Sequence, residues 1–135
     1  MKREIKFRAY SSHNHKMYPV SDIEWDIDGR IWVTADDGKN GIELIDEEAH
    51  LTQYTGLHDK NGREIYEGDI IVTHPKSRYE APKSGVVQFG GSCPSFGYKT
   101  EDGEEYDIWS SNAYRTYEVI GNIFENPELL EAQHE

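Results

Sequence analysis

One stretch of the chain, residues 51–72, restricts the fold more than any other. It reads LTQYTGLHDKNGREIYEGDIIV, with apolar residues on either side of Asn61-Gly62. An Asn-Gly pair tolerates the left-handed backbone of tight hairpin turns, so it predicts two antiparallel strands joined by a turn, with positive φ at Gly62. Asp59 and Lys60 belong to the same turn. The segment is not a calcium-binding loop of the EF-hand type, because its glycine comes at the fourth position and not at the sixth. These residues specify backbone geometry and no chemistry.

The second half of this stretch predicts a bend followed by a buried strand. Gly68 lies in the Glu-Gly-Asp segment 67–69, directly before a β-branched run. Side chains alternate between the two faces of a strand. We therefore expect Ile70 and Val72 to face the core and Ile71 to be partly exposed.

The rest of the chain has the same β character. Short segments in which apolar and polar residues alternate are separated by turn residues, a pattern typical of small all-β folds. We expect a mainly β protein with a small SH3-like barrel over about residues 51–124. Residues 1–50 are expected to form an N-terminal β-meander packed on the barrel. Asn126-Pro127 predicts the start of a short C-terminal helix, so the barrel domain covers residues 51–135.

Charge is the strongest compositional indication of function. The chain has 26 acidic and 14 basic residues and a formal net charge of −12. Proteins bind duplex nucleic acid mainly through Lys and Arg contacts to phosphate, so this charge disfavours a duplex partner. It favours solubility or a basic protein partner. The candidate interaction residues are one acidic cluster and one basic cluster: Asp46, Glu47, Glu48, Lys76, Arg78 and Lys83.

The sequence carries no signal for export or for a membrane. The charged N-terminus is not followed by an apolar run, and no stretch approaches the roughly 20 apolar residues that span a bilayer. Cys93 is the only cysteine, which rules out an internal disulfide and fits a reducing compartment. We expect a cytoplasmic protein that does not bind membranes.

No residue pattern predicts a catalytic, metal or cofactor site. His13 and His15 have the spacing of some metal ligands, but they lie in a polar turn. Further ligands would have to come through tertiary proximity, from His50, His58 and His74. Cys93 has neither a following helix nor a nearby cation to lower its thiol pKa. We therefore expect a protein that is not an enzyme and has no cofactor.

The aromatic residues allow two interpretations. Three Trp, nine Tyr and four Phe are many for a chain of 135 residues. Core packing is the prediction for six of them: Trp25, Trp32, Phe89, Phe96, Trp109 and Tyr117. Alternatively, a small barrel displays aromatics that stack on single-stranded bases beside the basic cluster. The net acidity argues against the basic groove that such a platform needs.

Three segments of the chain, in this order, are similar to a known family. They are residues 3–9 (REIKFRA), residues 53–70 (QYTGLHDKNG and then IYEGDI) and residues 117–130 (YEVIGNIFENPELL). Together they resemble the YopX family, which is found largely in phages and prophages. The resemblance is loosest between Val72 and Thr116. It implies a phage-encoded, largely β protein of no established activity, and it brings no catalytic residues.

These observations lead to one principal expectation and two alternatives. The principal one is a non-catalytic phage or prophage accessory protein in the host cytoplasm, which acts by protein–protein interaction and forms a homo-oligomer. The first alternative is a single-stranded nucleic-acid-binding barrel that uses Lys76, Arg78 and Lys83. The second is a metal-dependent enzyme built on the histidines.

Overall fold

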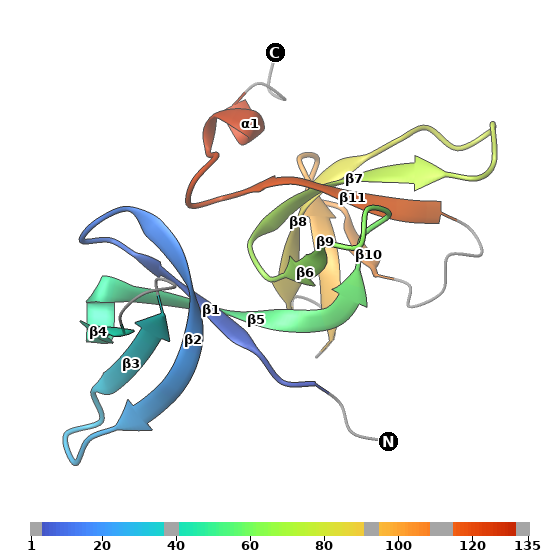
Figure 1. Ribbon diagram of the computed structural model, residues 1–135. Helices are drawn as coiled ribbons and strands as arrows, with labels where there is room; N and C mark the ends of the chain where they lie inside the picture. The colour runs from blue at the N-terminus through green and yellow to red at the C-terminus, as the bar shows by residue number, and fades with distance from the viewer. Residues whose placement is uncertain (1–3, 37–40, 91–94, 109–114, 132–135) are drawn as a thin grey trace. The chain divides into compact units, whose positions relative to one another are not determined.

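The structure, a computed structural model, describes residues 4–36, 41–90, 95–108 and 115–131. It divides into two units, Met1–Tyr54 and Thr55–Glu135. Each unit contains its own cluster of buried hydrophobic side chains. Nearly all regular structure is antiparallel β, and one short helix follows the last strand (Figure 1). The predicted mainly β fold with a short C-terminal helix is therefore confirmed.

Unit 1 is built from four strands and the first part of a fifth. The elements are β1 (Phe7–Ser11), β2 (Lys16–Trp25), β3 (Ile31–Asp36), β4 (Gly41–Ile45), the 3-10 helix η1 (Asp46–Glu48) and β5 (Ala49–His58). The strand order is β4-β3-β2-β1-β5, and β5 continues into unit 2. The buried centre consists of Ala9, Val33 and Leu44.

Unit 2 contains a five-stranded antiparallel sheet. After the short β6 (Glu64–Tyr66) come β7 (Asp69–Pro75), β8 (Ser84–Phe89), β9 (Phe96–Thr100), β10 (Glu105–Asp107), β11 (Arg115–Asn122) and α1 (Glu128–Glu131). The strand order is β10-β9-β8-β7-β11. Within the described residues β10 and β11 are the two edges of this sheet, and no pairing between them closes it into a ring. The antiparallel strand pairing is consistent with the expected small SH3-like barrel, without a closed ring of strands.

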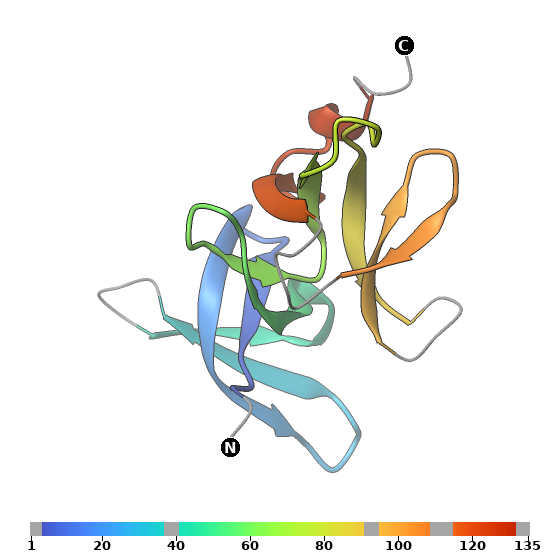
Figure 2. The same ribbon diagram turned by 90° about the vertical axis from the view of Figure 1, so that its right-hand side faces the viewer.

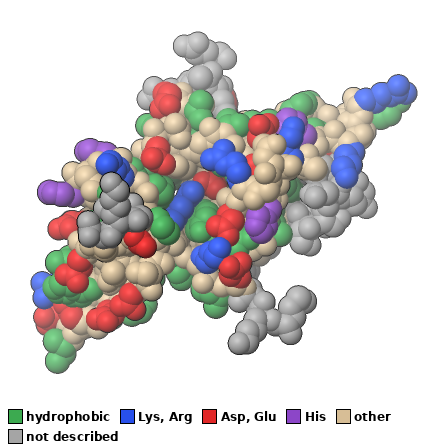
Figure 3. Space-filling view, in the orientation of Figure 1, with side chains coloured by type: hydrophobic (Ala, Val, Ile, Leu, Met, Phe, Trp, Pro, Cys, Tyr) green, Lys and Arg blue, Asp and Glu red, His purple; other side chains and the backbone are tan. Residues whose placement is uncertain are grey.

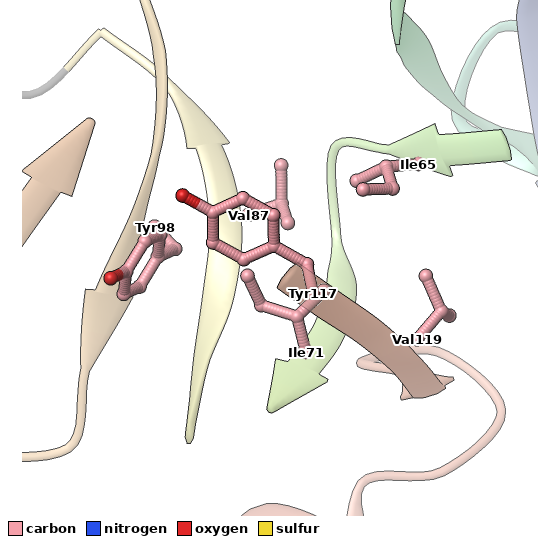
Figure 4. Close-up of a cluster of buried hydrophobic side chains, with 6 residues drawn as sticks. All are labelled: Ile65, Ile71, Val87, Tyr98, Tyr117 and Val119. Atoms are coloured by element: carbon pink, nitrogen blue, oxygen red, sulfur yellow. The ribbon is translucent and has the colours of Figure 1, made fainter. Parts of the chain in front are cut away.

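The core of unit 2 combines aliphatic and tyrosine side chains (Figure 4). Ile65, Ile71, Val87 and Val119 surround the two buried rings of Tyr98 and Tyr117. The two rings meet edge to face, with centroids 5.9 Å apart. Tyr98 also stacks on the half-buried Tyr106, with ring centroids 5.3 Å apart. Edge-to-face and stacked pairs stabilise a core beyond the area they bury.

Both faces of β7 are covered, which corrects the predicted exposure of Ile71. Ile70 and Ile71 are both fully buried, whereas Val72 is only half-buried. Ile71 packs in the core, and Ile70 pairs with Gly121 on β11. A Cβ at Gly121 would come within 3 Å of Asn126 and Leu129, so the chain after β11 covers this second face. Figure 2 shows α1 lying close to the strands of this sheet. The sequence of β7 alone does not show that the segment after β11 covers its second face.

The turn between β5 and β6 is organised by one buried carboxylate. Asp59 is 7% exposed, and its Oδ1 accepts hydrogen bonds from the backbone N–H groups of Asn61 and Arg63, each at 2.9 Å. Gly62 has φ +84°, as predicted, and Gly68 at the next bend has φ +83°. Asn61 does not have a positive φ. The loop is therefore a wider turn that ends in a left-handed glycine.

Candidate interaction surfaces

The predicted acidic residues form a single exposed turn in unit 1. Asp46, Glu47 and Glu48 make up η1, between β4 and β5, and none of them is buried. Backbone contacts hold the turn, since the Ser12 N–H donates to the Glu48 carbonyl oxygen at 3.0 Å. The three carboxylates therefore project into solvent from a fixed backbone.

Two of the predicted basic residues lie in the β7–β8 loop of unit 2, which extends beyond the neighbouring strands (Figure 1). Lys76 and Arg78 are exposed. The Arg78 guanidinium lies 5.2 Å from the centroid of the Tyr79 ring and donates to the Tyr79 hydroxyl at 3.2 Å. Tyr79 is itself 86% exposed. The end of the loop thus presents cations beside an aromatic ring, which is visible in Figure 3 as basic and hydrophobic side chains together.

Lys83, the third predicted basic residue, has a different environment. Its Nζ lies 4.2 Å from the centroid of the Tyr106 ring and donates to the Tyr106 hydroxyl at 2.9 Å. That hydrogen bond raises the pKa of the Lys83 ammonium group above its ordinary value. Lys83 is thus held against β10, while Lys76 and Arg78 stay exposed in the loop.

The aromatic residues divide between core and surface. Tyr117 is buried as predicted, and Trp32 and Phe96 are half-buried. The core prediction is wrong for Trp25 and Phe89, which are 66% and 54% exposed. Trp109 lies outside the described residues.

Trp25 belongs to an apolar surface at the end of the β2–β3 hairpin that sequence reasoning missed. Trp25 pairs with Ile31, two positions beyond the pair of Ile23 with Val33. Since side chains two apart share a face, Trp25 extends the core face of the sheet past the residues that cover it. Ile27, in the connecting loop, is fully exposed. The alternating pattern indicates the face of the sheet on which Trp25 lies, but it does not show how far along that face other residues bury the side chains.

Carboxylates also lie at this end of the hairpin. Asp22 and Glu24 are exposed but alternate with Ile23 and Trp25, so they point to the opposite face of the sheet, whereas Asp28 lies in the connecting loop with Ile27. Figure 3 shows acidic next to hydrophobic side chains at this end of unit 1. Asp26 stabilises the hairpin end, because its Oδ2 accepts hydrogen bonds from Trp32 Nε1 at 3.0 Å and Arg30 Nε at 2.9 Å. The hydrogen bond from Trp32, with others from Arg30 and Asp28, lowers the pKa of Asp26 to about 2.

The structure brings two of the histidines near one residue, since the rings of His15 and His50 both lie against Tyr10, with centroids 6.4 and 6.2 Å from it. His13 and His15 occupy the turn between β1 and β2, and His74 Nε2 lies 2.8 Å from Oε1 of Glu118 across the β7–β11 pair. Among the described residues no group of three or more His, Cys, Asp or Glu side chains is arranged to hold a metal ion. Cys93 lies outside the described residues. No helix in the described part of the chain is long and apolar enough to cross a membrane.

Open cavities also lie in the described part of unit 2. One, of about 310 Å³, lies between β8, β9 and Leu130 of α1. The other, of about 190 Å³, lies beside Gln88, Phe96 and Glu105. Typical small-molecule sites have volumes of about 300–1,000 Å³. The larger cavity is at the lower limit of this range, and the smaller cavity is below it.

Comparison with known proteins identifies the family. Two crystal structures resemble the chain over nearly its whole length. Protein EF1440 from Enterococcus faecalis is 30% identical, with a TM-score of 0.63 over 96% of this chain and 99% of that one. Protein yopX from Bacillus subtilis is 21% identical, with a TM-score of 0.65 over 93% and 95%. No functionally curated protein matches the chain. Residues 6–131 match the family described as YopX protein, and the chain therefore belongs to the YopX family.

Proposed function

We propose that this protein is a non-catalytic accessory protein, encoded by a phage or prophage, that acts in the bacterial cytoplasm by binding another protein. We further propose that it forms homo-oligomers. The observation that carries the proposal is the uncovered end of the β2–β3 hairpin, where Trp25 is 66% and Ile27 fully exposed.

The composition of this hairpin end fits a protein-binding surface. Trp25 and Ile27 are two residues apart at the end of one hairpin, and exposed apolar groups gathered in one place on a small soluble domain are typical of interaction sites. Trp is also enriched among the residues that contribute most to binding. The hydrogen bonds from Trp32 and Arg30 to Asp26 fix the hairpin before a partner arrives. A preorganised surface loses less conformational entropy on binding.

The charge around the hairpin indicates a basic partner. Asp28 is exposed in the loop that carries Ile27, Asp22 and Glu24 are exposed on the opposite face of β2 from Trp25, and η1 adds three more carboxylates to unit 1. Complementary charge steers encounter and selects partners more than it adds affinity. We therefore expect a partner surface that offers Lys or Arg around an apolar pocket.

The non-catalytic part of the proposal is supported by the buried carboxylates that the structure describes. Asp59 accepts three backbone hydrogen bonds, from Asn61, Arg63 and Val119. Asp69, only 1% exposed, accepts one from the Tyr66 N–H at 2.8 Å. Carboxylates used in this way hold turns and strands in place.

Binding of single-stranded nucleic acid is the competing function. Arg78 and Tyr79 form the stacked cation–aromatic pair that such proteins use. Next to that pair, however, the loop adds only Lys76 as an exposed cation, and a net charge of −12 repels phosphate. The same experiment must therefore examine both kinds of partner.

The test is affinity capture from bacteria that carry the gene, with the wild type and two variants. Trp25→Ala with Ile27→Ala removes the apolar hairpin surface, and Phe89→Ala is the matched control, because it removes an exposed aromatic from unit 2. We expect one protein to be retained by the wild type and the control and lost from the hairpin variant. Equal retention by all three refutes the proposal. A gel shift provides the test of the competing function. If the wild type binds single-stranded DNA at micromolar concentration, and the variant Lys76→Glu with Arg78→Glu does not, nucleic-acid binding replaces protein binding as the function.

A further inference from the structure

We propose that the β2–β3 hairpin of one copy of this chain docks on the β7–β8 loop of a second copy. This inference rests on the proposed function, since it names the partner of the same hairpin. Both surfaces are exposed, and each lies at the end of a hairpin of its own unit (Figure 1).

The two surfaces carry opposite charge. Residues 21–30 contain four acidic residues (Asp22, Glu24, Asp26 and Asp28) against one basic residue, Arg30. Residues 75–83 contain three basic residues (Lys76, Arg78 and Lys83) against one acidic residue, Glu80. In a chain whose net charge is −12, the loop is a local basic exception, so another copy of the chain offers it a surface of opposite charge.

The apolar groups are complementary as well. The hairpin offers Trp25 and the fully exposed Ile27, and the loop offers Tyr79, 86% exposed. Arg78 lies along the Tyr79 ring, at 5.2 Å from its centroid. An indole ring is the best aromatic partner for a guanidinium or ammonium group, and aromatic rings also pack on each other. Docking would therefore cover the three most exposed large apolar side chains of these two hairpins together.

Charge excludes the symmetric alternatives. Two β2–β3 hairpins placed against each other would oppose four carboxylates with four, and two β7–β8 loops would oppose cations with cations. Like charges in an interface disfavour that pairing, so the acidic hairpin selects the basic loop. Such a contact joins two different surfaces, and it closes into a ring or continues into a longer assembly.

Ionic strength should affect the assembly in two ways. At physiological salt the screening length is about 8 Å. Repulsion between whole chains of charge −12 is then largely screened, while charges in direct contact across the hairpins still attract. Self-association should be measurable at physiological salt and weaken as salt rises further.

Sedimentation equilibrium of the full chain tests the proposal. The first variant, Asp22→Lys with Glu24→Lys, reverses the hairpin, and the second, Lys76→Glu with Arg78→Glu, reverses the loop. We expect each variant alone to self-associate at least tenfold more weakly than the wild type. An equimolar mixture of the two should associate again, because the reversed hairpin of one then complements the reversed loop of the other.

The matched control is Glu101→Lys with Glu104→Lys, at the exposed turn between β9 and β10, which changes net charge by the same amount as the hairpin variant. It should associate at least as strongly as the wild type, and thermal melts should show that all variants fold. The inference is overturned if the wild type stays monomeric at every concentration, if the mixture does not associate, or if the control weakens as much as the hairpin variant. A monomeric wild type that still captures a different protein through Trp25 refutes this inference and the proposed homo-oligomer, and leaves the proposed binding of another protein intact.

Discussion

Asp59→Asn should destabilise the protein by removing one hydrogen bond at the edge of the core. In the native chain Oδ1 of Asp59 accepts from two N–H groups of its own turn, and Oδ2 accepts from the Val119 N–H at 2.9 Å. An amide keeps one oxygen for the turn, but its NH₂ group cannot accept a hydrogen bond. The substitution therefore leaves the turn in place and removes the bond to β11.

The cost follows from burial. Val119 is 6% and Asp59 7% exposed, so water cannot replace the lost acceptor freely. An unsatisfied buried donor costs about 1–3 kcal/mol, and bonds to a charged acceptor are at the upper end of the range. We expect a loss of about 2 kcal/mol, which at roughly 4 °C per kcal/mol lowers the melting temperature by about 8 °C. Urea denaturation followed by tryptophan fluorescence measures the free energy directly.

Asp26→Asn is the matched control, because Asp26 has the same turn geometry. Its Oδ1 accepts from the backbone N–H groups of Asp28 and Arg30, each at 2.9 Å, but its Oδ2 bonds to the side chains of Arg30 and Trp32. Water reaches that site, so the loss should be clearly smaller than at Asp59. Equal losses in the two variants, or no measurable loss at Asp59, would refute the reasoning.

The comparison of the wild type with Asp59→Asn also predicts a pH dependence of stability. Burial raises the pKa of Asp59, but the hydrogen bonds from Val119, Arg63 and Asn61 outweigh it, and the net pKa lies below its ordinary value. A carboxyl whose pKa is lower in the folded than in the unfolded protein stabilises the fold above its unfolded pKa, and that contribution is lost as the pH falls through the folded value. The gap between wild type and Asp59→Asn should be constant at neutral pH and narrow below about pH 4.

Four further variants test the rest of the structure. Gly62→Val should cost about 1 kcal/mol or more, because a β-branched side chain resists the φ of +84°, and an unchanged melting temperature would contradict the turn. Ile71→Ala should cost about 2–4 kcal/mol, and Ile70→Ala a similar amount, since both are fully buried; near-wild-type stability of either variant in urea would contradict its burial. Replacing Asp46, Glu47 and Glu48 with lysine should slow association with a basic partner in stopped-flow measurements and leave the melting temperature unchanged, because all three project from η1; an unchanged on-rate would remove this turn from the binding surface.

Local chemistry explains which elements could be predicted from the sequence. The glycines at 62 and 68 and the bend before β7 follow from residues that are neighbours in the chain, and they were correctly placed. The burial of Ile71 and the exposure of Trp25 depend on which distant segment covers each face. Residues 126–129 cover the second face of β7, whereas nothing among the described residues of unit 1 covers the end of the β2–β3 hairpin. Alternation along a strand assigns each side chain to one of the two faces of the sheet. It does not show how much of each face is covered by other segments.

The candidate surfaces were only partly predictable for a related reason. The basic loop was found because Lys76 and Arg78 are charged and flanked by prolines, features that the sequence displays directly. The alternating pattern predicts a core position for Trp25, because aromatic residues in such segments usually pack there. The 66% exposure of Trp25 shows that its ring lies outside, although its strand partner Ile31 still packs on the buried cluster of unit 1.

The motifs that identify the YopX family specify architecture, and this explains why they do not disclose function. Asp59 joins its turn to β11, Asp69 holds the bend before β7, and Asn122 accepts from the N–H groups of Phe124 and Glu125 to shape the turn toward α1. The two surfaces proposed to bind, the end of the β2–β3 hairpin and the β7–β8 loop, lie in the segments between these motifs. A chain can change Trp25, Ile27 or Tyr79 without disturbing any of those hydrogen bonds. Members of one fold therefore need not share a partner, and the partner of this chain has to be sought with its own hairpin and loop.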